Sequence, residues 1–66
     1  MKLILNGEER EFEGPLTVAD LLGRLGISGE GIAVAVNLEV VPRGELDRRQ
    51  LVEGERVEIV RAVGGG

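Results

Sequence analysis

Residues 16–26 read LTVADLLGRLG and carry the start, the apolar face and the end of one short helix. Thr17 and Asp20 have the spacing of a capping box, in which side-chain oxygens accept free N–H groups at the helix start. Gly26 is the residue type that ends a helix in the left-handed conformation. The sequence therefore predicts a helix from Val18 to Leu25. Its apolar face has the spacing i, i+3, i+4, i+7 and consists of Val18, Leu21, Leu22 and Leu25.

Two extended segments precede this helix, at residues 2–5 and 9–13. Between them lies Asn6-Gly7-Glu8, and Asn-Gly is the strongest two-residue signal for a β-hairpin because both positions tolerate a positive φ. Phe12 stands between two glutamates, which is the alternation of a strand with one face on the core. Gly14-Pro15 then ends the second strand. We predict a β-hairpin here.

An apolar run follows the helix at residues 32–36, with the sequence IAVAV. A continuous apolar run predicts a central strand that is covered on both faces or nearly so. Val40-Val41 is predicted as a brief partner strand across the turn at residues 37–39. Pro42 ends that strand, because proline cannot donate to a ladder.

The remainder of the chain is predicted as a polar connection and a last strand. The connection covers residues 44–55, with Leu46 and Leu51 as its anchors. The strand runs from Arg56 to Val63. By alternation, Val57 and Ile59 face the core, whereas Glu58, Val60 and Ala62 face outward.

The predicted order is strand, strand, helix, strand, short strand, strand. A single short helix buries its apolar stripe only by crossing one face of a sheet. We therefore predict an α+β roll in which a mixed sheet of four to five strands packs on one helix. Residues 1–63 form a single domain, and residues 64–66 form a flexible glycine tail.

Composition and charge narrow the classes of partner. The chain has 66 residues, twelve acidic against eight basic, with a net charge of −4 and Phe12 as its one aromatic residue. This balance disfavours nucleic acid, which calls for a basic surface and aromatic stacking platforms. No apolar run approaches the length of a membrane span, and the first residues do not form a signal peptide. We expect a cytoplasmic protein with no membrane partner.

The usual catalytic side chains are scarce. Histidine, cysteine and tyrosine are absent, and Ser28, Thr17 and Lys2 are the single representatives of their types, each in a structural or exposed setting. Thiolate metal ligands are therefore excluded, and no calcium-loop pattern is present. We expect that the chain is not an enzyme and binds no metal or cofactor itself.

The carboxyl-terminal residues Gly64, Gly65 and Gly66 directly follow the last predicted strand. Glycine lets a backbone thread a narrow channel and presents an unhindered carbonyl group. A terminal carboxylate is ionised at neutral pH and needs activation, for instance as a mixed anhydride with AMP, before a nucleophile can attack it. The chain has no phosphate-binding glycine loop, so the nucleotide site belongs to another protein. The tail thus indicates a carrier or substrate, although a frayed end or a cloning remnant is the alternative.

Several stretches resemble the ThiS family, the ubiquitin-like sulfur carriers of thiamine thiazole synthesis, and the resemblance implies a β-grasp fold. They are residues 6–8, 16–22, 34–37, 39–43 and 54–60, with the end at 62–66 as the most specific. Leu38 departs from the pattern, because glycine is expected in this Asn-Gly-Glu turn, and the type of turn is left open.

The resemblance also implies a function. Gly66 would be adenylated by an E1-like, ThiF-type enzyme that uses ATP, and then converted to a thiocarboxylate with sulfur from a persulfide donor. Thiazole synthase, of the ThiG type, would receive the sulfur. Gly65 and Gly64 would thread the tail into the partner's active site. In related ubiquitin-like proteins the partner docks on the face of the sheet beside the last strand. This resemblance places Val60, Ala62 and Val63 at a partner interface.

Three other functions remain open from the residues alone. A carrier for molybdopterin synthesis or for tRNA thiolation ends in the same glycines. A protein modifier would be joined to target lysines through Gly66. A noncovalent β-grasp module, for instance one that contacts RNA, fits the acidic balance least.

Overall fold

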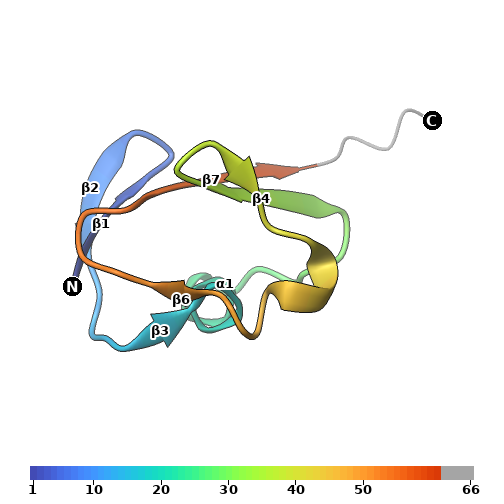
Figure 1. The fold of residues 1–66 in the computed structure, drawn as a ribbon, viewed down its shortest axis with the longest axis horizontal. Helices are drawn as coiled ribbons and strands as arrows, with labels where there is room; N and C mark the ends of the chain where they lie inside the picture. Colours follow the sequence, from blue (N-terminus) through green and yellow to red (C-terminus); the bar gives the residue numbers. More distant parts are fainter. Residues whose placement is uncertain (62–66) are drawn as a thin grey trace.

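The computed structural model describes residues 1–61, which fold into two layers (Figure 1). One layer is a five-stranded sheet in the order β2-β1-β7-β4-β5. Its strands are β1 Lys2–Leu5, β2 Glu8–Glu11, β4 Ile32–Val36, β5 Glu39–Val40 and β7 Arg56–Arg61. β1 and β7 pair in parallel, and the other neighbours pair antiparallel. The predicted mixed sheet is confirmed.

The other layer contains the helix and a small second sheet. Its elements are α1 Val18–Leu25, the two-residue strands β3 Leu16–Thr17 and β6 Gln50–Leu51, and the 3-10 turn η1 Arg43–Glu45. Side chains from the two layers meet in one core. Its buried members are Leu3, Leu5, Leu16, Val18, Leu21, Leu22, Val34, Val36, Leu51 and Val57.

Helix α1 has the bounds that the sequence predicts. The hydroxyl of Thr17 accepts from the N–H of Asp20 at 3.0 Å, and the Asp20 carboxylate accepts from the N–H of Thr17 at 3.0 Å. The bond from the Thr17 backbone lowers the pKa of Asp20. At the other end Gly26 has φ +70°, and the N–H of Ile27 donates to the carbonyl of Leu22 at 2.9 Å. The cap and the glycine together confine the helix to two turns.

The strand β4 differs from its prediction in how many of its faces are covered. Val34 and Val36 are buried, but Ala33 is exposed and Ala35 half-buried, so one face of the strand is covered rather than both. The strand lies between β7 and β5, so its predicted place inside the sheet is confirmed, and the middle one of the five strands is β7. The prediction that both faces are covered was wrong because it counted the alanines as apolar residues that need burial. Alanine is small enough to face water at little cost in free energy.

The strand β2 begins and ends earlier than residues 9–13. The turn uses only Asn6 and Gly7, so that Leu5 pairs with Glu8 and the strand runs from Glu8 to Glu11. All four of its residues are exposed, which is typical of a charged edge strand. Phe12 follows the strand and is half-buried against the core.

The connection at residues 44–55 contains structure that the sequence did not predict. Strand β6 pairs with β3, with Leu16 opposite Leu51. Leu51 is buried and Leu46 half-buried, so both predicted anchors are confirmed. Strand β5 is Glu39–Val40, one residue earlier than predicted. Strands of two residues are too short to show a periodicity in the sequence.

The turn between β4 and β5 keeps the conformation that glycine would favour. Val36 pairs with Glu39, which leaves a two-residue loop, and its residues Asn37 and Leu38 have φ +51° and +70°. Two positive φ values are the signature of the type I′ hairpin turn. Leu38 therefore holds a left-handed conformation that costs a residue with a Cβ about 1–2 kcal/mol.

We predict that Leu38→Gly stabilises the domain by about 0.5–1 kcal/mol, because the strain relieved exceeds the added backbone entropy of the unfolded chain. Leu38 is 76% exposed, so little apolar burial is lost. Denaturant unfolding measures the effect. Leu38→Ala is the matched control, since it removes most of the side chain but keeps the Cβ. If Leu38→Gly were no more stable than Leu38→Ala, the strain at this position would be contradicted.

Candidate functional site

The candidate site begins at the end of β7, which is the strand that leads into the glycine tail. β7 lies between β1 and β4, and its residue Val57 is fully buried. β1 pairs with the start of β7, and β4 pairs with β7 from Val57 to Arg61, so the strand that leads into the tail lies inside the sheet. The predicted site residues Ala62, Val63, Gly64, Gly65 and Gly66 lie outside the described residues.

Two asparagines in the hairpin turns hold β7 from its two sides. Asn6 Oδ1 accepts from the N–H of Ile59 at 2.9 Å, and Asn37 Oδ1 accepts from the N–H of Arg56 at 3.1 Å. The backbone N–H groups of the asparagines donate to the carbonyls of Val57 and Arg56. Both asparagines have a left-handed φ, which asparagine tolerates better than most residues. Their contacts with β7 were missed, because sequence reasoning treated these positions only as turn residues.

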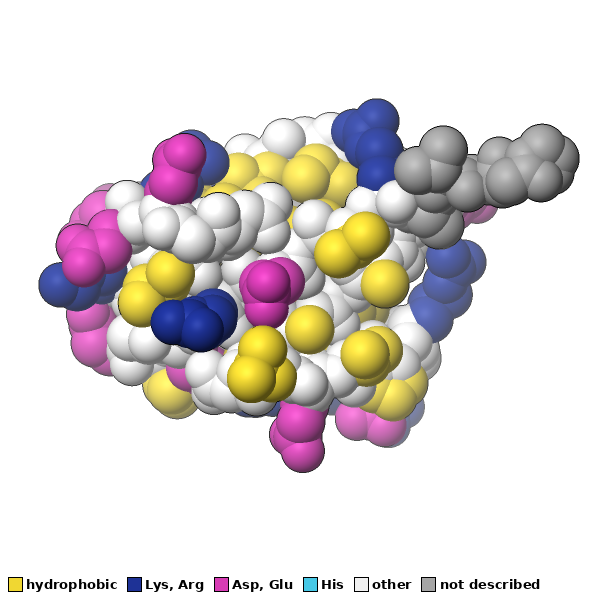
Figure 2. Space-filling model, turned by 90° about the horizontal axis from the view of Figure 1, so that it is seen from above, with side chains coloured by type: hydrophobic (Ala, Val, Ile, Leu, Met, Phe, Trp, Pro, Cys, Tyr) yellow, Lys and Arg dark blue, Asp and Glu magenta, His cyan; other side chains and the backbone are white. Residues whose placement is uncertain are grey.

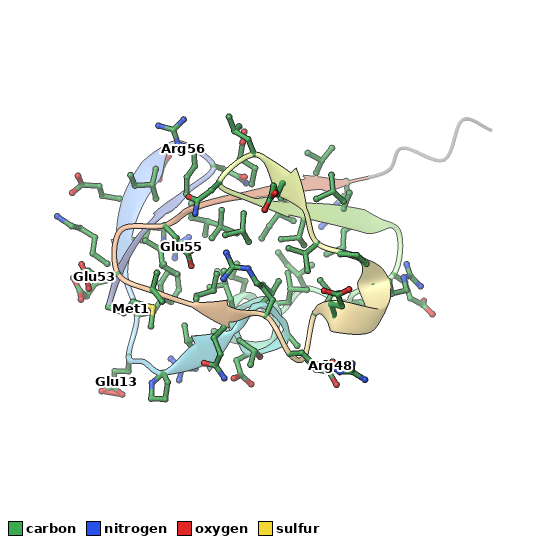
Figure 3. All side chains as sticks on the ribbon, viewed as in Figure 1. Met1, Glu13, Arg48, Glu53, Glu55 and Arg56 are labelled. Atoms are coloured by element: carbon green, nitrogen blue, oxygen red, sulfur yellow. The ribbon has the colours of Figure 1, made fainter. Side chains whose placement is uncertain are left out.

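Glu55 joins this arrangement from the residue before β7. Its carboxylate accepts from Arg49 Nη2 at 2.8 Å, the N–H of Val52 at 2.8 Å and Asn37 Nδ2 at 3.0 Å. Glu55 is 8% exposed, and Figure 3 shows it between the two layers of the fold. Burial acts to raise the pKa of Glu55, but the hydrogen bonds and the charge of Arg49 outweigh it and hold the pKa below its ordinary value. The start of β7 is therefore anchored by an ionised carboxylate.

The face of the sheet away from α1 is an exposed surface with apolar character, seen in Figure 2. The register places Val60 beside Ala33, and Ala35 between Glu58 and Val40. Val60 is 61% exposed, so its predicted outward direction is confirmed. We call this surface the outer face. Its members are Ile4, Ala33, Ala35, Val40, Glu58 and Val60, of which the sequence analysis singled out Val60 as an interface residue.

The described part of the chain lacks two other kinds of feature, a cluster of metal ligands and a membrane-spanning helix. Among residues 1–61, no three His, Cys, Asp or Glu side chains gather into a possible metal site. Over the same residues, no helix has the length and apolar character needed to cross a membrane.

Comparison with known proteins identifies the family. A sequence profile of the ThiS family matches residues 3–66. The chain belongs to the ThiS family. The sulfur carrier protein ThiS of Thermus thermophilus is 39% identical over 62 residues, which are 94% of this chain and 95% of that protein. A crystal structure of the thiamine biosynthesis protein ThiS from Geobacter metallireducens superposes with a TM-score of 0.88 at 33% identity, over the full length of both chains. The predicted β-grasp fold is confirmed.

A ThiS-like segment also occurs within longer proteins. A protein of Paramagnetospirillum magneticum named thiazole synthase is 46% identical over 66 residues, which are all of this chain and 20% of that protein. This chain spans about a fifth of the length of the first curated relatives that it matches.

Proposed function

We propose that this chain is a sulfur carrier of thiamine biosynthesis and that the carboxylate of Gly66 is the group that carries the sulfur. The observation that carries this proposal is the match of nearly the whole chain to nearly the whole of a sulfur carrier protein ThiS. The architecture supports it, since a tail that must enter another protein's active site benefits from a rigid starting point. β7 supplies that point through its pairing with β4 up to Arg61, its pairing with β1 at its start, and its asparagine contacts.

The proposed chemistry follows from the low reactivity of a carboxylate. An E1-like adenylating enzyme joins Gly66 to AMP from ATP and releases diphosphate. A persulfide of the donor then attacks the carbonyl and AMP leaves, which joins the tail to the donor through an S–S bond. A thiol of a partner protein breaks that bond by forming a disulfide with the donor's remaining sulfur, and the tail is left as a thiocarboxylate. Gly65 and Gly64 present no side chain to the walls of the partner's channel. In this scheme the chain binds no cofactor and catalyses no step; it is the co-substrate of its partners.

Thiazole synthase is the proposed recipient of the sulfur. The support is that a ThiS-like segment is part of relatives that bear the name thiazole synthase. A deletion strain of the source organism tests this recipient. The strain should need this chain to grow without thiamine, and a chain that lacks Gly66 should not restore growth. A strain that loses molybdoenzyme activity but still makes thiamine would contradict thiazole synthase as the recipient.

The outer face is the proposed docking surface for the adenylating enzyme, together with Ala62 and Val63 at the root of the tail. Its exposed apolar side chains lie on the strand that delivers the tail and on the neighbouring strands β4 and β5. Contact residues at the centre of an interface contribute through the apolar area that they bury.

Val60→Glu is expected to weaken binding to the adenylating enzyme about tenfold or more, since a charge would replace an apolar contact at an interface. The free energy of unfolding should change by less than about 0.5 kcal/mol, because Val60 is largely exposed. Calorimetric titration of the enzyme measures the affinity. Val52→Glu is the control, since Val52 is an exposed valine in the loop between β6 and β7. Unchanged affinity of the Val60 variant would remove the outer face from the proposal.

A further inference from the structure

A second exposed feature lies on the other side of β7, where the core is left open at one end. A recess of about 340 Å³ is bounded by the β1–β2 hairpin, the end of α1, the start of β4 and the end of β7. Four half-buried aliphatic side chains contact the core and also line this recess. They are Leu25, Ile27, Ile32 and Ile59. The apolar surface of the core is thus incompletely covered at this end.

Two arginines, Arg10 and Arg61, also line the recess. The Arg10 guanidinium lies 5.6 Å from the centroid of the Phe12 ring, a distance at which a cation is attracted to an aromatic face, and the same side chain lines the recess. Within residues 1–61, neither arginine has a carboxylate within ion-pair distance. Glu30 lines the adjoining hollow beside Arg61 and forms no ion pair within the same range. In a chain of net charge −4, two basic side chains on an apolar recess favour an acidic occupant.

The backbone next to the recess has room for an extended segment. β1 pairs with β7 only as far as Leu5 opposite Val57, and the chain then turns away at Asn6. Beyond that point the N–H of Ile59 is taken by Asn6 Oδ1. On the edge of β7 that faces β1, the next backbone groups are the carbonyl of Ile59 and the N–H of Arg61. Neither group has a backbone partner among residues 1–61. Such an edge can pair with an extended peptide.

We propose that this recess binds an extended acidic segment of thiazole synthase. An aliphatic side chain of the segment fills the space over Leu25 and Ile27, while its carboxylates pair with Arg10 and Arg61. The segment's backbone extends the sheet at the end of β7. The inference rests on the proposed function for the identity of the partner, and it adds a contact on the helix side of β7, opposite the outer face. A partner bound in this recess contacts the end of β7, directly before the tail.

The test is the affinity of thiazole synthase from the same organism for Arg10→Glu, with Arg48→Glu as the control. Both arginines are exposed, and both substitutions change the net charge equally. Arg48 lies in the loop after η1 (Figure 3) and is not among the residues that line the recess. By calorimetry, Arg10→Glu should bind at least about tenfold more weakly, and Arg48→Glu within about twofold of the wild type. Equal affinities of the two variants would overturn the proposal.

A second measurement locates the contact by methyl NMR of the complex. The signals of Leu25, Ile27 and Ile32 should shift when thiazole synthase is added, and shifts confined to the outer face would overturn the proposal. Inorganic phosphate alone should leave these signals unchanged; shifts with phosphate would instead indicate a site for small anions. If the wild-type chain binds thiazole synthase and accepts sulfur while Arg10→Glu binds equally well, the proposed binding at the recess is refuted. The proposed carrier function is then unaffected. No binding and no sulfur acceptance by the wild type would refute both.

Discussion

Replacing Gly65 by valine is expected to slow the loading of Gly66 on the order of 100-fold, because a branched side chain next to the reacting carbonyl displaces it in a narrow channel. Valine also restricts the φ and ψ values that a threaded backbone needs. The buried core described above lies within residues 1–61, so the domain should unfold at the wild-type temperature.

The rate of AMP formation with the adenylating enzyme, ATP and a persulfide donor measures this effect. Gly64→Val is the matched control, since the same side chain then stands one residue farther from the carboxylate. We expect its loading to fall less than that of the Gly65 variant. Loading of the Gly65 variant at the wild-type rate would show that the tail is not threaded through a channel.

Removing the Glu55 carboxylate is expected to have the largest effect on stability. Glu55→Ala leaves Arg49, the N–H of Val52 and Asn37 Nδ2 without their acceptor. These donors belong to half-exposed or exposed residues and can turn partly to water, so the loss of their charged acceptor is expected to cost about 1.5–3 kcal/mol. A domain of this size has a total stability of only about 3–10 kcal/mol. The melting temperature should fall by about 10 °C or more.

Thermal and denaturant unfolding test this prediction, with Glu13→Ala as the control. Glu13 is exposed and forms no hydrogen bond or ion pair through its side chain among residues 1–61, and Figure 3 shows it on the loop before β3. Its replacement should change the free energy of unfolding by less than about 0.5 kcal/mol. Equal stabilities of the Glu55 and Glu13 variants would mean that the Glu55 hydrogen bonds contribute nothing net.

The contribution of Glu55 should also depend on pH. Its pKa is lower in the folded protein than the ordinary value of 4.5, so the ionised carboxylate stabilises the fold. That stabilisation is complete above the unfolded pKa and is lost as the pH falls through the folded pKa. The gap in unfolding free energy between the wild type and Glu55→Gln should therefore shrink below about pH 4.5. A gap that stays constant into the acid range would contradict the lowered pKa.

The helix was predicted to the residue because its signals are local. Thr17, Asp20 and Gly26 act within one or two turns of chain, so the sequence shows them directly. Strands β3 and β6 were missed because each has two residues and their pairing joins Leu16 to Leu51, far apart in the chain. The exposure of Ala33 was missed because an apolar run does not distinguish a small side chain that tolerates water from one that avoids it.

The candidate site was predictable only in part. Alternation along the last strand placed Val60 outward, but its neighbours on the outer face come from β4 and β5 through the register of the sheet. The side chains of Asn6 and Asn37 reach β7 across long separations in the sequence, which no local pattern reveals. That the carried group is sulfur was inferred from the resemblance to the ThiS family, since no spacing of residues indicates it.

The intact mass of the protein after incubation with its adenylating enzyme, ATP, a persulfide donor and a thiol reductant tests the carrier function most directly. The mass should rise by the difference between sulfur and oxygen, and the product should react with an alkylating reagent that captures thiocarboxylates. The reagent is needed because oxidation changes the mass almost equally. Both signals should be absent without ATP and in a chain that lacks Gly66. A chain that stays unmodified with every E1-like enzyme of its organism, or a signal that persists without Gly66, would contradict the account.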